Sequence, residues 1–421
     1  MATDAFGRLR VSEPFTTFNY YPTEAYNDTS DNDVWLRDSS GGGGIEYDTS
    51  NNLIKIFIEG GVVTPNPDKF AYRGTKVPME YQPGKSRLIM MSGVMMDPIP
   101  PPNTQIFSRM GLMNIASPVI TDGVYFEVDG SNNTLNWCES VQDGSGSYIV
   151  NKIPDASWNI DKFNGSGPSG KTVSFSNMNK VILLVIDQEW LGVGRLRCGF
   201  NIDGVTYYAH TFTHSSLSYA YTASPRQRLG YEILTGISGE TPAIKYTMKQ
   251  ICCTCMSEGG FFPLGTRNSV TSNTAGLTAA TNKLILAIRL KSGSKYKNGI
   301  IKPLGLDIVN TSSGSSTASY ELRLLSRING TTIGTHIPDS SFNPIANSMV
   351  NYYAPTGSIT VTGGYVINSG FITSRTNTIF NSNDYETLLT RALCTQYDTL
   401  AIVTTNSSGT VVASIDFIES L

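Results

Sequence analysis

The chain has 421 residues, of which 15% are charged, and its 31 basic and 34 acidic side chains give a formal net charge of -3. The charged fraction is well below the roughly 25% of an average soluble domain. No cluster of four or more Lys or Arg occurs, which argues against the basic stripe that nucleic-acid binding needs. No apolar run approaches the roughly 18 residues of a membrane span, and the N-terminus lacks a signal-peptide core, so we expect neither membrane insertion nor export.

Residues 1–50 have the character of an extended arm more than of a core. The segment is rich in aromatic side chains, is broken by Pro and Gly, and shows no sustained helical or strand period. Such a segment either lies across its own domain or docks on a neighbouring protein, because its apolar surface is unfavourable in water. The candidate docking residues are Phe6, Arg8, Leu9, Arg10, Phe15, Phe18, Tyr20 and Tyr21.

From residue 51 to residue 262, short segments of strand length recur between Gly, Pro, Asn and Asp, which predicts a β domain. The clearest is Val181–Ile186, a continuous run of Val, Ile and Leu that we interpret as a strand buried on both faces. Residues 196–202 alternate between apolar and polar, and Asp203-Gly204 then favours a type I′ hairpin turn. This turn predicts the cross-strand pairs Ile202 with Val205, Phe200 with Tyr207, and Cys198 with Ala209.

A domain boundary is expected at Gly259–Pro263, so that residues 263–421 form a second β domain. Only residues 383–394 have a helical pattern, with Asn383 and Glu386 in the spacing of a capping box. The predicted fold class is therefore all-β. We expect two antiparallel β-sandwich domains with jelly-roll-like connections, preceded by the N-terminal arm.

The segment Gly165–Thr172 matches the phosphate-loop pattern G-x-x-x-x-G-K-[ST], in which backbone amides bind phosphates and Lys171 would reach the outer ones. A phosphate loop must open a helix, because the helix N-terminus supplies part of the field. The residues that follow, 173–185, have a strand pattern instead. We therefore expect a Gly/Ser loop and no bound nucleotide.

His210 and His214 are four residues apart on a predicted strand, a separation of about 13 Å that one metal ion cannot bridge. The predicted register places Arg197 opposite His210, so we expect both histidines on the surface. The three cysteines between residues 252 and 255 lack a second pair at zinc spacing and are expected to be small buried apolar side chains in a protein made in a reducing cytosol. We expect no metal and no cofactor.

Asp187 and Glu189 lie two residues apart on an extended segment that ends at Trp190, and Glu139 lies near another tryptophan. Paired carboxylates beside aromatic rings suit a sugar-cleaving site, and exposed Trp and Tyr suit glycan binding without cleavage. The alternative is that these carboxylates cap loops or pair with Arg195 or Arg197. The possible glycan-contact residues are Trp137, Glu139, Glu189 and Trp190. No G-x-S-x-G signature of a serine hydrolase is present.

The opening block DAFGRLRVSEPFTTF, Asp4–Phe18, resembles the start of a family of virion structural proteins found in tailed bacteriophages and other large double-stranded DNA viruses. Further blocks are similar to the same family: GVYFEVDG, LNWCESVQDGSG, WNIDKFNGSGPSG, EWLGVGRLRCGF, the strand with His210 and His214, and SEGG at Ser257–Gly260. The resemblance spans about residues 4–262, and the second β domain matches only loosely. It implies location in a virus particle more firmly than a particular task.

We therefore expect a non-enzymatic structural component of a virus particle, in the capsid, neck, tail or fibre, assembled in the host cytoplasm. The aromatic arm would dock on other virion proteins, and a homo-oligomer is expected, with no nucleic-acid partner. The alternative function is a receptor-binding or glycan-binding fibre component that contacts a host surface glycan. A glycan-degrading enzyme is a further, less favoured alternative.

Overall fold

The computed structural model divides the chain into two compact units, Met1–Phe261 and Phe262–Leu421, beside the boundary expected from the sequence. The structure describes residues 14–22, 35–59, 69–75, 78–79, 81–116, 119–142, 148–215, 217, 220–222, 224–236, 244–259, 265–272, 277–278, 281–291, 300–311, 318–328, 331–333, 335, 337–372, 389–390, 399–405 and 409–420.

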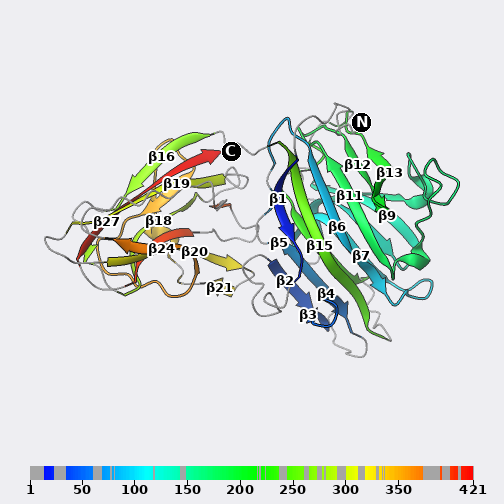
Figure 1. Cartoon of the computed structure of the whole chain (residues 1–421), viewed down its shortest axis with the longest axis horizontal. Helices are drawn as coiled ribbons and strands as arrows, with labels where there is room; N and C mark the ends of the chain where they lie inside the picture. The colour runs from blue at the N-terminus through cyan, green and yellow to red at the C-terminus, as the bar shows by residue number, and fades with distance from the viewer. Residues whose placement is uncertain are drawn as a thin grey trace. The chain divides into compact units, whose positions relative to one another are not determined.

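Two antiparallel sheets make up the described part of the first unit (Figure 1). Sheet A has eight strands in the order β13-β12-β11-β6-β15-β4-β3, and its eighth strand, β1, pairs with the end of β15 that β4 leaves open. Their bounds are β13 Val205–Phe212, β12 Leu196–Ile202, β11 Val181–Gln188, β6 Arg87–Asp97, β15 Tyr246–Glu258, β4 Leu53–Ile58, β3 Gly43–Asp48 and β1 Pro14–Tyr20. Sheet B has seven strands: β10 Tyr148–Pro154, β9 Thr134–Gln142, β8 Val119–Asp129, β7 Ile106–Ala116, β14 Arg228–Thr235, β5 Phe70–Thr75 and β2 Trp35–Ser40, in that order.

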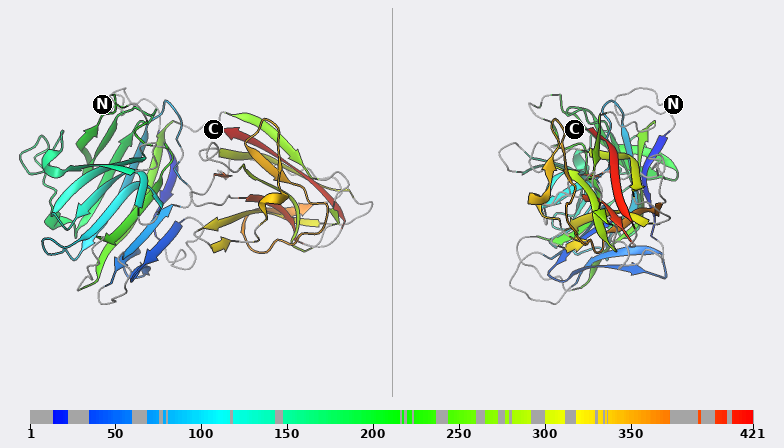
Figure 2. Two further views of the ribbon diagram at one scale, coloured as in Figure 1. Left: turned by 180° about the vertical axis from the view of Figure 1, so that it is seen from behind. Right: turned by 90° about the vertical axis from the view of Figure 1, so that its left-hand side faces the viewer.

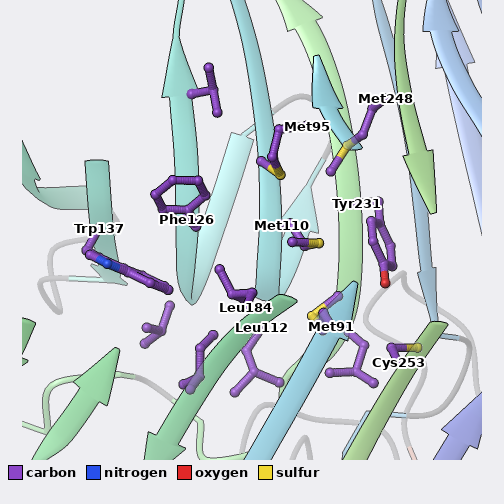
Figure 3. Packing of buried hydrophobic residues seen from close by; sticks show 14 of the residues in the cluster. Met91, Met95, Met110, Leu112, Phe126, Trp137, Leu184, Tyr231, Met248 and Cys253 are labelled. Carbon is purple, nitrogen blue, oxygen red and sulfur yellow. The ribbon is translucent and has the colours of Figure 1, made fainter. Parts of the chain in front are cut away.

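The core of the first unit lies between sheets A and B. Successive side chains of a strand point to opposite faces, so every second residue of each strand enters this space. Met91 and Leu184 of sheet A meet Met110, Phe126 and Trp137 of sheet B there, and all five are 0% exposed (Figure 3). Burying a side chain of this size stabilises a fold by roughly 1.5–3 kcal/mol, so this layer holds the two sheets together.

The predicted hairpin turn is present between β12 and β13. Asp203 (φ 54°) and Gly204 (φ 81°) both have the positive φ that a type I′ turn requires. Two of the three predicted pairs are confirmed, Ile202 with Val205 and Phe200 with Tyr207.

A β-bulge after Cys198 shifts the rest of that register. Cys198 pairs with His210 instead of Ala209, and Arg197 pairs with Thr211 instead of His210, so both of those predictions are wrong. The sequence marks the place with Gly199, because a Cβ there would lie 2.1 Å from the carbonyl oxygen of Tyr207. A one-residue shift turns side chains to the opposite face, and this one turns His210 inward.

Among the described residues, the N-terminal strand corrects the prediction of an irregular arm over residues 1–50 and agrees with the alternative that this segment lies across its own domain. β1 pairs with β15 from Pro14 opposite Glu258 to Tyr20 opposite Cys253. Its side chains Phe18 and Tyr20 pack against Trp35, with ring centroids 6.2 and 4.8 Å away. Residues 14–20, 35–40 and 43–48 are therefore strands of the first unit. No local signal predicts this, because Thr17 and its hydrogen-bond partner Cys255 are 238 residues apart.

The second unit is also built from two antiparallel sheets, again within the described residues. Sheet C has the order β16 Thr266–Thr271, β27 Thr410–Ser420, β19 Ile300–Asn310, β25 Leu389–Thr390, with β17 Leu277–Thr278 paired to β27. Sheet D has the order β21 Thr331–Ile333, β20 Ala318–Ile328, β26 Thr399–Thr404, β18 Lys283–Leu290, β23 Val350–Tyr353, β22 Asn343–Pro344, with β24 Tyr365–Ile372 paired to β20. Leu286 and Leu322 of sheet D pack with Ile308 and Ile415 of sheet C in one buried cluster.

The predicted helix over residues 383–394 lies outside the described residues, except that Leu389–Thr390 is a short strand paired with β19. In the described part of the chain the helical elements are three 3₁₀ turns, η3 Asp155–Ser157, η4 Phe175–Asn177 and η6 Asp339–Ser341. The all-β fold class with antiparallel sandwiches is therefore confirmed (Figure 2). None of the described helical segments has the length and apolar character needed to cross a membrane.

Candidate functional site

The four possible glycan-contact residues do not form one surface. Trp137 and Glu139 lie two residues apart on β9 and therefore share its inward face. Trp137 packs against Phe126 and Phe200, with ring centroids 5.2 and 5.8 Å away. It is 0% exposed, so in the folded protein it presents no surface to a glycan.

The other three candidates belong to one connected polar group, which we name the end cluster. Its two halves are linked by Tyr221, whose hydroxyl donates to the carbonyl oxygen of Glu189 at 3.4 Å. Its members are Glu139, Glu189, Trp190, Tyr81, His214 and Tyr221. They come from β9, from the end of β11 and from segments outside the strands. Their side chains, apart from the half-buried Trp190, are almost fully enclosed.

One half of the end cluster is organised by His214. Its Nδ1 lies 2.5 Å from the carbonyl oxygen of Gly194 and its Nε2 lies 2.8 Å from Oε1 of Glu139. Because a carbonyl oxygen only accepts, Nδ1 is the donor in the first contact. The imidazole also stacks on Tyr221, with ring centroids 3.9 Å apart and planes at 9°. These contacts join the chain after β13 to the turn before β12 and to β9.

The other half is organised by Tyr81. Its hydroxyl donates to Oε1 of Glu189 at 2.9 Å and accepts the backbone N–H of Leu191 at 3.2 Å. Burial, together with the nearby charge of Glu189, raises the pKa of Tyr81 to about 12. Trp190 packs edge-on against Tyr81 at 6.0 Å and donates from Nε1 to Oγ1 of Thr222 at 2.7 Å.

This arrangement ties loops to the sandwich. Glu189 is 0% exposed, and Glu139 is held by His214, so neither carboxylate reaches the surface where a glycosidic bond would lie. Trp190 is the most accessible of the four predicted residues. Sequence reasoning missed Tyr81 and Tyr221, which no motif marks.

Asp187 pairs with an arginine, which is the structural role given above as the alternative to glycan cleavage. Its Oδ2 lies 2.5 Å from a guanidinium nitrogen of Arg197 and accepts the Tyr208 hydroxyl at 3.1 Å. The predicted pairing of this strand-end carboxylate with Arg197 is confirmed.

The expectation that His210 and His214 lie on the surface is wrong. His210 is 7% exposed and His214 is 3% exposed. Nδ1 of His210 accepts the backbone N–H of Asn159 at 3.3 Å, and burial lowers the pKa of His210 to about 4. The segment that contains Asn159 also covers the outer edge of β13. The backbone N–H groups of Ile160 and Asp161 there both donate to the carbonyl oxygen of Ala209. That edge is thereby protected from pairing with another chain.

The phosphate-loop lookalike is a loop closed by a bridge between its ends, Asn164 and Thr172. The turn η4 follows it, which corrects the expectation of a strand throughout residues 173–185. Asp161 fills its centre and accepts the backbone N–H groups of Phe163 and Ser169, both at 2.8 Å. Burial acts in the opposite direction, yet these hydrogen bonds lower the pKa of Asp161. A phosphate would therefore meet an ionised carboxylate where the motif needs amides.

The cysteines differ from one another. Cys253 and Cys255 are buried as expected, whereas Cys252 is exposed, which corrects the prediction for that residue. Its Sγ lies 2.9 Å from Oγ of Ser92. No group of three or more His, Cys, Asp or Glu side chains that could hold a metal ion occurs in the described ranges.

Sequence reasoning also missed a ladder of charges across the outer face of sheet B. In the register of β8, β7 and β14, Arg109 lies between Glu127 and Glu232, and its guanidinium donates to them at 2.8 and 3.0 Å. Lys152 of β10 reaches Glu127 at 2.7 Å and Asp129 at 2.6 Å. Burial raises the pKa of Glu232, which is 0% exposed. Because Arg109 is 18 and 123 residues away from its partners, no spacing pattern reveals the ladder.

The candidate docking residues fall into three groups. Phe6, Arg8, Leu9 and Arg10 lie outside the described residues. Phe18 and Tyr20 pack against the core of their own unit. Phe15 is 38% exposed and Tyr21 is 70% exposed, so these two remain available to a neighbour.

No family model and no curated protein matches this sequence. Among solved structures, the chain is similar to an endo-1,3-beta-glucanase from Streptomyces sioyaensis at 11% identity, covering 59% of this chain and 97% of that one, with a TM-score of 0.36. It is similar to arcelin-5, a lectin-like defence protein from Phaseolus vulgaris, at 11% identity, covering 57% and 96%, with a TM-score of 0.34. It is also similar to the CBM2 module of the evolved Dit of Lactobacillus casei BL23 phage J-1, at 10% identity, covering 60% and 99%, with a TM-score of 0.33.

Proposed function

We propose that this protein is a non-enzymatic structural component of a virus particle, assembled in the host cytoplasm, and that its N-terminal segment docks on neighbouring virion proteins. The observation that carries the proposal is the state of β1. β1 contains the last residues of the block Asp4–Phe18 that resembles virion proteins. Phe18 and Tyr20 pack on the core of the first unit, whereas Phe15 near its start and Tyr21 just after its end are exposed.

This geometry suits a docking element. A strand that is already paired along one edge is pre-organised, so a partner that binds it does not have to offset the entropy of ordering it. Within the described residues β15 is its one strand partner, and in this proposal a strand of a neighbour adds along the opposite edge of β1. An exposed tyrosine supplies a large apolar surface with a polar end, as is common where proteins meet.

The absence of enzymatic function is part of the proposal. Its support is that Glu139 and Glu189, the carboxylates best placed by sequence for glycan cleavage, are enclosed in hydrogen bonds of the end cluster. A polysaccharide turnover assay tests it, with Glu189→Gln as the comparison. Turnover by the native protein that is lost in the variant would contradict it.

The docking proposal is tested by particle assembly with a variant chain. Removal of residues 1–13 combined with Phe15→Ser and Tyr21→Ser leaves the anchors Phe18 and Tyr20 in place, so the first unit should still fold. We expect its copy number on purified particles to fall at least about tenfold, since an aromatic residue at the centre of an interface contributes roughly 2 kcal/mol or more when it is a hot spot. The matched control is Val205→Ser, a 50% exposed apolar residue elsewhere on the unit. Full occupancy by the triple-change chain would refute the proposal.

Glycan binding is a second candidate function, favoured by one observation. Trp190 is half-buried and its ring is fixed by Tyr81 and Thr222, as a platform for a sugar ring should be. A glycan array tests it: binding by the native chain that is lost on Trp190→Ala would support a receptor-binding role. An array on which the native chain binds nothing would remove this candidate.

A further inference from the structure

The outer face of sheet A is apolar where a solvated face should be polar. In β11, Leu184 and Ile186 point into the core, whereas Leu183 and Val185 point to the outer face and belong to no part of the inter-sheet cluster. An antiparallel sheet with one wet face normally alternates apolar inside with polar outside. On the outer face of β11, Val185 is 0% exposed, whereas Leu183 keeps accessible surface among the described residues of the first unit.

Cross-strand register gathers more apolar side chains on this face. β11 lies between β6 and β12 in Figure 1, and β6 lies between β11 and β15. Val185 stands opposite Met90 of β6, and Met256 of β15 stands opposite Leu88. We name this surface the outer patch; it consists of Leu88, Met90, Val94, Leu183, Val185 and Met256.

The outer patch is partly accessible. Leu88, Met90, Leu183 and Met256 are half-buried, whereas Val94 is 5% and Val185 0% exposed. Apolar residues that are exposed singly are scattered over the surface of most proteins. A contiguous group of accessible apolar side chains on one face is instead typical of an interaction surface.

The charges around the outer patch decide which partner it fits. Lys249 pairs with Asp97 at 2.6 Å, and Lys55 pairs with Asp48 at 2.9 Å. Arg197 of β12 is likewise paired with the carboxylate beside it on β11. Each of these cations is neutralised on its own face, so a partner of opposite charge gains no complementarity, whereas a copy of the same face meets no like-charge repulsion.

We propose that the outer patch is a contact surface between two copies of this chain, which pack sheet A against sheet A about a two-fold axis. Such an interface is self-complementary, with an apolar centre and a polar rim. Two sheets that pack face to face align their strands within about 30°, so the central strands β6 and β11 of both copies form the middle of the contact. The inference is independent of the proposed docking through β1.

The first test is the mass of the full chain in solution. At about 20 µM, light scattering after size exclusion should give twice the 45.7 kDa of one chain. Leu183→Lys and Met90→Lys should each weaken the dimer at least about 100-fold, because each places a charge in the apolar centre. Val205→Lys, at an exposed position whose cross-strand partner Ile202 packs on the core, should leave the dimer intact.

The second test needs no variant and uses Cys252, which lies on the outer face opposite Ser92 and is exposed. Alkylation of its thiol, followed by peptide mass spectrometry, should slow as the concentration of native chain rises through the dimer range. A native chain that stays monomeric, a dimer that survives both lysine variants, or a Cys252 reactivity that does not change with concentration would each overturn the proposal. Protection of Cys252 in a monomer would mean that the same chain covers the patch.

Discussion

His210 makes the stability of the first unit dependent on pH. Burial lowers the pKa of its imidazole from 6.5 to about 4, so the unfolded chain binds a proton at a pH where the folded chain does not. The free energy of unfolding therefore falls as the pH drops from about 6.5 toward 4, and His210 has little effect above that window. With 1.36 kcal/mol for each pKa unit, the loss is about 2 kcal/mol at pH 5 and about 3 kcal/mol at pH 4.

The assay is urea denaturation followed by tryptophan fluorescence. All four tryptophans of the chain lie in the first unit, so the signal reports its unfolding alone. The comparison is with His210→Gln, whose side-chain oxygen can accept the Asn159 N–H but does not titrate. Contributions of the carboxylates cancel in the difference between the two proteins. Between pH 7 and pH 5 the native protein should lose about 2 kcal/mol of unfolding free energy relative to His210→Gln. A difference that stays constant would refute the reasoning.

Three further predictions concern buried polar contacts of the first unit. Arg109→Met removes the cation shared by two buried glutamates and should lower the free energy of unfolding by about 3 kcal/mol. The control Lys171→Met, at an exposed ion pair, should leave that free energy unchanged. Equal effects of the two variants in urea denaturation would show that the charge ladder does not stabilise the unit. Because burial raises the pKa of Glu232 above 4.5, its stabilising contribution is complete below pH 4.5 and is lost as the pH rises above that value. Glu232→Gln should flatten this decline in melting temperature with rising pH, and an unchanged slope would argue against it. Tyr20→Phe removes the 2.9 Å hydrogen bond from Arg73 and should cost about 1–2 kcal/mol in the same denaturation experiment, so an unaltered midpoint would show that β1 is anchored otherwise.

Local pattern was sufficient for the fold class and for the central hairpin. The period of two in residues 196–202 and the Asp-Gly turn specify an antiparallel pair without reference to the rest of the chain, and the structure has both. The division near residue 262 is likewise marked by Gly and Pro in the sequence. These features depend on neighbours a few residues apart, which is the range over which backbone preference and alternation act.

The sites were decided by contacts between distant residues. The end cluster joins Glu139 to His214, which are 75 residues apart, and it encloses carboxylates that the sequence suggested for glycan contact. The bulge after Cys198 reversed the predicted exposure of His210, since one extra residue changes which face a side chain occupies. The sequence of β11 predicted burial on both faces, but only the sheet order showed that Leu184 and Ile186 face the core while Leu183 and Val185 lie on the outer face. Composition and alternation act over a few residues. Which side chains pack on each face of a strand depends instead on the strands that the folded chain brings side by side.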